Sequence, residues 1–135
     1  MADIGVTPAS VLPGADASIQ YDRTAGGTVT AGDAVYVASD GHYEPCTTAS
    51  AVLAKCVGIA LNGASDGQPL AVQSSGLITI GGTAIVGEVY CVSDNAGKLA
   101  PDAEVLSGDF RTVIATGVTA AVINIQINVS GVAVP

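Results

Sequence analysis

The last third of the chain carries the clearest alternation of hydrophobic and polar positions. From Ile123 to Val129 every second residue is apolar, and an Asn or Gln stands between each pair. A period of two places these two sets of side chains on opposite faces of an extended strand. We therefore predict a half-buried β-strand here, with one face in the core and one in solvent.

Short apolar runs rich in Val, Ile, Thr and Tyr fill most of the remaining chain. Clusters of Gly, Asn, Asp and Ser separate them, for example at residues 39–41, 62–67 and 93–97. Short strands between such turn-forming clusters are typical of sandwiches and barrels. Helical signals are confined to residues 48–57 and 101–106, which predict at most a turn or two. The pattern thus predicts an all-β fold, a small β-barrel or sandwich.

One phrase of the sequence occurs twice. "TAGDAVYVASDGHYEP" at residues 30–45 returns as "VGEVYCVSDNAGKLAP" at residues 86–101, with a Gly-acid pair, Val-Tyr, Ser-Asp, Gly and Pro in the same order. Aligned on Val-Tyr, the second copy lacks one residue before that pair and gains two before the Gly. Asp and Gly suit tight hairpin turns. We interpret the copies as two similar hairpin units, at about 30–77 and 85–131, within a single β-domain of residues 19–135.

The first 18 residues have no sustained period. Proline lacks a backbone donor and fixes φ, so residues 1–18 are expected to form an extended N-terminal arm rather than an interior strand. Apolar residues in such an arm need a surface to cover, either on their own domain or on a neighbouring subunit. The candidate interface residues are Ile4, Val6, Pro8, Val11, Leu12 and Pro13.

Composition and charge exclude several classes of partner. Apolar residues make up 49% of the chain, and 12 acidic against 4 basic residues give a net charge of −8. Nucleic-acid binding needs Lys and Arg at phosphates, so we expect no nucleic-acid partner. Residues 68–87 and 112–135 are almost uncharged, but their interior polar residues argue against membrane spans. The N-terminus resembles no secretory signal, so we expect synthesis in the cytoplasm and no membrane association.

Candidate chemistry is sparse. The three cysteines, Cys46, Cys56 and Cys91, have no CxxC spacing and only one histidine beside them, so we interpret them as reduced, apolar core residues rather than metal ligands. His42 follows a Gly turn and is expected to be exposed. No nucleophile elbow, phosphate loop or dinucleotide fingerprint is present. We therefore expect no enzyme, no catalytic residue and no cofactor.

Carboxylates near the turns raise the question of a cation site. No loop has the dense alternation of acidic residues that gathers six or more oxygens on one Ca²⁺ ion. We expect these side chains to be solvated and to bind no metal. They are Asp33, Asp40, Glu44, Glu88 and Asp94.

The chain from about Gly27 to Leu77 resembles a known family. "TVTAGDAVYVASDGHYEP" followed by "CVGIALNGASDGQPLAV" is similar to the small cement or decoration proteins of tailed bacteriophages. That family has a Gly-x-x-Val-Tyr strand, a D-x-G turn, a Pro, a "vGvAl" strand and a further turn in this order. The second half of the chain echoes the same succession.

The resemblance implies a structural virion protein on the outer surface of an assembled capsid. Such proteins bind the major capsid protein at joints between capsomers, here expected as a homotrimer or else a dimer, often through an N-terminal arm. Deleting residues 2–14 is then expected to leave a folded domain that no longer decorates capsids. The alternative is a receptor- or glycan-binding β-module of a phage fibre or bacterial surface structure. Against that alternative, we interpret Tyr36 and Tyr90 as packing across a sheet rather than as a sugar platform.

Overall fold

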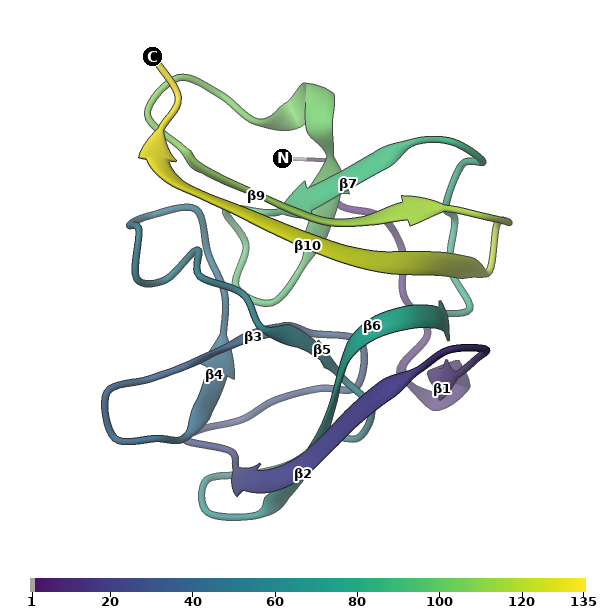
Figure 1. Cartoon of the computed structure of the whole chain (residues 1–135), viewed down its shortest axis with the longest axis vertical. Coiled ribbons are helices and arrows are strands. Elements are labelled where there is room, and N and C mark those ends of the chain that lie inside the picture. The colour runs from purple at the N-terminus through teal and green to yellow at the C-terminus, as the bar shows by residue number, and fades with distance from the viewer. Residues whose placement is uncertain (1) are drawn as a thin grey trace.

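The computed structural model describes residues 2–135 and is built almost entirely of antiparallel strands (Figure 1). The predicted all-β class is confirmed. The helical content of these residues is two 3₁₀ turns, η1 (Pro8–Ser10) and η2 (Asp102–Glu104). The strands are β1 (Leu12–Pro13), β2 (Ser18–Thr24), β3 (Ala34–Val37), β4 (Tyr43–Pro45), β5 (Gly58–Ala60), β6 (Pro69–Thr79), β7 (Val89–Val92), β8 (Leu99–Pro101), β9 (Phe110–Gly117) and β10 (Val122–Ala133).

The strands form one curled sheet, and the order of its strands is symmetric about the centre. The order is β4-β3-β5-β6-β10-β9-β7-β8, with β1 and β2 also paired to β6. The β6–β10 pair lies at the centre. On one side of it follow β5 and then the β3–β4 hairpin, and on the other side follow β9 and then the β7–β8 hairpin. We call β3–β6 the first half and β7–β10 the second half; they form the lower and upper parts of the molecule in Figure 1.

Both copies of the repeated phrase fold as hairpins, β3–β4 and β7–β8. Their Gly-acid pairs have the same role. Gly32 donates to the carbonyl of Ala60 and Ala60 donates back to Asp33, each at 2.8 Å. Gly87 and Glu88 exchange the same two bonds with Gly117, each at 2.9 Å. The Gly-acid pair thus ties each hairpin to the middle strand of its own half.

The backbone register corrects the alignment of the two phrases. Pro45 lies opposite Val35, whereas Pro101 lies opposite Tyr90, so Val35 and Tyr90 are equivalent. No gap precedes the strand, and Tyr36 and Tyr90 are not counterparts. A shift of one residue moves a side chain to the other face of a sheet. The two halves therefore turn opposite faces towards their common core.

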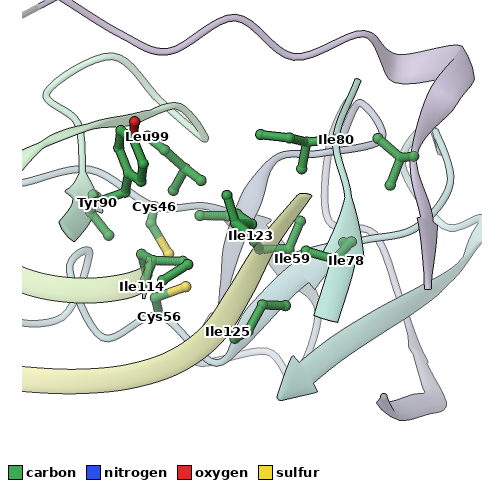
Figure 2. Packing of buried hydrophobic residues seen from close by; sticks show 14 of the residues in the cluster. Cys46, Cys56, Ile59, Ile78, Ile80, Tyr90, Leu99, Ile114, Ile123 and Ile125 are labelled. Carbon is green, nitrogen blue, oxygen red and sulfur yellow. The ribbon is translucent and has the colours of Figure 1, made fainter. Parts of the chain in front are cut away.

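That common core lies between the two halves, and its packing is shown in Figure 2. We call it the central core; the two tyrosines Tyr36 and Tyr90 both belong to it. A smaller side core fills the other face of the first half, around Val35, Tyr43 and Leu70. The strand at 123–129 has the predicted pattern at its start, where Ile123 and Ile125 are buried, while its far end is more exposed.

Strand β6 serves both halves because it bends. Its first part pairs with β2 and β5, and its last part pairs with β1 and β10. Gly76 lies near the change of partners with φ of +88°. A Cβ atom there would lie 2.3 Å from the carbonyl oxygen of Asp16. Both the left-handed backbone and the close approach therefore require glycine.

A substitution tests the close approach of β9 to the β6–β7 loop. A Cβ atom on Gly117 would lie 2.0 Å from the carbonyl oxygen of Ile85, whereas one on Gly27 would meet no heavy atom within 4 Å. We expect Gly117→Ala to lower the free energy of unfolding by roughly 1–3 kcal/mol. Gly27→Ala should change it by less than about 0.5 kcal/mol. Urea unfolding of both variants measures the difference, and equal effects would contradict the packing.

Candidate interaction surfaces

The N-terminal segment lies on its own domain. The backbone N–H of Ile4 donates to the carbonyl of Leu99, and that of Thr7 donates to Ile80, each at 2.9 Å. Further along, β1 pairs with the end of β6. The sequence left two surfaces possible for this segment, its own domain or a neighbouring subunit. The structure places it on its own domain, where backbone hydrogen bonds hold it at several points.

The six candidate residues of the arm separate into two groups. Val11 is buried in the central core, and Ile4 and Val6 pack against it. These three side chains contact the core of their own domain, Val11 fully and Ile4 and Val6 in part, so their role at a capsid or subunit interface stays a prediction. The residues that remain on the surface are Leu12, 62% exposed, together with Pro8 and Pro13.

The large exposed apolar side chains gather partly at one end of the molecule. We call this end the loop end; it contains Leu12, Ile85, Val86 and Val118, which are between 41% and 72% exposed. None of the last three was a candidate from the sequence. Two of them stand side by side just before the repeated Gly-acid pair, and this signal could have identified them. The other exposed large apolar residues are Tyr21, Val52, Leu106 and Val132.

Hydrogen bonds between loops build the loop end. Ala84 of the β6–β7 loop donates to Ala120 of the β9–β10 turn at 2.9 Å. Thr79 of β6 lies between Leu12 on one side and Val122 on the other. These segments lie together at the right of Figure 1, where β1, the end of β6 and the β9–β10 turn meet.

Charge is distributed unevenly over the molecule. Residues 77–87 and 112–127, which supply most of the loop end, contain no charged residue. Three exposed acidic residues, Asp22, Asp40 and Asp66, lie around the turns near the end of β2, and we call this region the acidic end. Asp16, in the β1–β2 turn beside Leu77, and Asp94, in the β7–β8 turn, are also exposed. The loop end is therefore mainly apolar, but the exposed acidic residues are not confined to the acidic end.

One of the turn carboxylates is not solvated as expected. Asp33 is 6% exposed, accepts a hydrogen bond from the backbone N–H of Thr30 at 3.0 Å, and pairs with the Lys98 ammonium at 3.4 Å. Because Lys98 belongs to the β7–β8 hairpin, this ion pair joins the two halves. Asp33 is thus a structural residue. His42, expected to be exposed, is half-buried, and its Nδ1 lies 2.6 Å from the Thr24 hydroxyl.

The tyrosines of the repeated phrase act in packing. Tyr36, Tyr43 and Tyr90 are buried, which confirms that interpretation for Tyr36 and Tyr90. The Tyr90 hydroxyl accepts a hydrogen bond from the backbone N–H of Ile85 at 2.8 Å, and so supports the loop end from below. Tyr21, in contrast, is 74% exposed.

Within residues 2–135 no three His, Cys, Asp or Glu side chains are placed to hold a metal ion, and the surface has no enclosed pocket. No helix in this part of the chain has the length and apolar character to cross a membrane. Neither the protein-family models nor the curated proteins give any match to the chain.

An ion pair beside β8 predicts a pH effect. The Arg111 guanidinium, 2.6 Å from the Asp102 carboxylate, lowers the pKa of that carboxyl below its usual 3.8. Because the pKa of Asp102 is lower in the folded state, the ionised carboxylate stabilises the fold at pH values above 3.8. This stabilisation is lost as the pH falls through the folded-state pKa. Both side chains are partly exposed, so the gain is at most about 1 kcal/mol. We expect Asp102→Asn to lower the Tm by about 2–4 °C at pH 7 and to have little effect near pH 2. Differential scanning calorimetry at both pH values measures this; an equal loss at both would exclude the ionic contribution.

Proposed function

We propose that this protein decorates the outer surface of an assembled phage capsid and stabilises the joints between capsomers, bound as a homotrimer to the major capsid protein. The resemblance of residues 27–77 to phage decoration proteins supplies the class. The single structural observation that supports it is the apolar loop end, most of which comes from two stretches of the chain without charged residues.

The loop end provides the attractive contact. Burying Leu12, Ile85, Val86 and Val118 against a capsid subunit removes apolar surface from water at about 25 cal/mol per Å². A trimer bound through three such ends gains from effective concentration, so individually modest contacts suffice. The acidic end would then face solvent, where its net negative charge opposes aggregation of the particles.

A decoration assay tests this surface. Undecorated capsids are mixed with wild-type protein or with the double variant Ile85→Ser/Val86→Ser, and occupancy is measured by sedimentation and electron microscopy. We expect the double variant to bind at least about ten-fold more weakly, since each large apolar side chain contributes about 1.5–3 kcal/mol when fully buried.

The matched control is Val52→Ser/Val132→Ser, which removes two equally exposed apolar side chains away from the loop end. It should bind as the wild type does. Equal binding by both double variants would reject the loop end as the contact surface. Absence of binding by the wild-type protein itself would reject the proposed function.

The exposed aromatic ring of Tyr21 favours a second candidate, a glycan-binding module. Aromatic faces are common sugar platforms because one side of a sugar ring is apolar. A glycan panel probed with wild-type protein and with Tyr21→Ala distinguishes the two functions. Binding to a glycan that Tyr21→Ala abolishes, together with no binding to capsids, would favour this alternative.

A further inference from the structure

Two of the three cysteines meet in the central core. Cys46 follows directly after β4 and Cys56 comes shortly before β5, and both are buried. Figure 2 shows their sulfur atoms turned towards one another among the apolar side chains of the core. Burial, and then the neighbouring thiol of Cys56, raise the pKa of Cys46. Cys91 lies elsewhere, with its sulfur 3.4 Å from the Asp102 carboxylate.

We propose that Cys46 and Cys56 form an intramolecular disulfide under oxidising conditions. The oxidant is a small-molecule disulfide such as oxidised glutathione. The Cys56 thiolate attacks one of its sulfurs and releases one small thiol; Cys46 then attacks the mixed disulfide at Cys56 Sγ and releases the second. The two cysteines together lose two electrons and two protons, and the oxidant gains both as two thiols.

The cross-link would fix the loop that joins the two halves. Residues 47–55 lie between the two cysteines, and their backbone carbonyls contact β9: Thr48 accepts a bond from the N–H of Phe110 at 3.0 Å, and Ala54 accepts one from the Thr112 hydroxyl. A disulfide closes this loop at its base and removes conformations from the unfolded chain. Oxidation gives up the weak bond from Cys56 Sγ to the Gly58 carbonyl and the thiol hydrogen bond between the two cysteines.

The setting for this chemistry is outside a reducing cytosol, where disulfides persist. The inference does not depend on the proposed function, because it concerns the isolated chain. It changes the interpretation of these two residues from inert apolar side chains to a pair that forms a cross-link in an oxidising environment.

The test uses the purified full-length protein, refolded to equilibrium in a buffer of reduced and oxidised glutathione so that burial does not limit access. Intact mass and alkylation after denaturation count the free thiols. We expect a main species that has lost two hydrogens and retains one alkylatable thiol, with a Tm about 5–10 °C above that of the fully reduced protein.

Single variants identify the pair. Cys91→Ala should still form the cross-link, whereas Cys46→Ala and Cys56→Ala should not. Three alkylatable thiols in the wild type at equilibrium, a cross-link that includes Cys91, or covalent dimers as the main product would each overturn the proposal. The number of free thiols is measured by mass, so the result can be interpreted even where a variant is less stable.

Discussion

Deletion of residues 2–14 is expected to abolish cooperative thermal unfolding of the domain. The segment places Val11 in the central core and packs Ile4 and Val6 against it, and its backbone bonds to Leu99 and Ile80. Loss of this burial and these hydrogen bonds removes about 4–7 kcal/mol. A domain of this size is stable by about 5–15 kcal/mol in total. Circular dichroism during heating measures the transition.

This result would reverse the expectation from the sequence, in which the truncated chain stays folded. A matched pair of point variants refines it. Val11→Ala should lower the free energy of unfolding by about 1–3 kcal/mol, whereas Leu12→Ala, its exposed neighbour, should change it by less than about 0.5 kcal/mol. A truncated protein with a wild-type Tm would show that the segment is dispensable to the fold.

Replacing Ile123 by Ala should give one of the largest losses of any single substitution. Ile123 lies opposite Ile78 in the β6–β10 pair, and both side chains are fully buried in the central core. Truncating a buried Ile to Ala costs about 2–5 kcal/mol because a cavity remains. Urea unfolding measures the loss. Val132→Ala, on the exposed end of the same strand, is the control and should be nearly neutral.

A double-mutant cycle shows whether Ile78 and Ile123 hold the two halves together. Residues in direct contact commonly couple by about 0.5–3 kcal/mol, while distant ones add. We expect the Ile78→Ala/Ile123→Ala variant to lose less than the sum of the two single losses. Strict additivity would indicate that the junction of the halves is supported mainly by other residues.

The class of fold could be predicted because its signals are local. Alternation from Ile123 to Val129 and Gly-acid or Ser-Asp-Gly turns depend on backbone preferences within a few residues. The position of the N-terminal segment depends on distant ones. Nothing near Val11 in the sequence indicates that it contacts the central core, and two prolines made the segment look like an arm. Its apolar residues were correctly recognised, but the surface that they cover belongs to the same chain.

The relation between the two halves was predictable only in part. The repeated phrase indicated two hairpins, but the sequence alignment placed a gap before the second Val-Tyr pair, whereas in the backbone Val35 is the counterpart of Tyr90 with no gap. The two halves turn opposite faces of their sheet towards the central core. Tyr36 and Tyr90 can therefore both be buried there only because they differ by one position along their strands. The position of Ile85 and Val86 before the second Gly-acid pair was a local signal, but their place in one apolar end depends on the contact of their loop with the β9–β10 turn.

The bent strand β6 also has a consequence for how quickly the chain folds. Its partners β1, β2, β5 and β10 come from both sides of it in the sequence, and Ile78 and Ile123 are 45 residues apart. The β3–β4 and β7–β8 hairpins need only short loops and close within microseconds. Assembly around β6 must close long loops first, which places such topologies in the millisecond-to-second range. Until β6 is in place, each hairpin leaves a strand edge unpaired, so aggregation competes with folding during this interval.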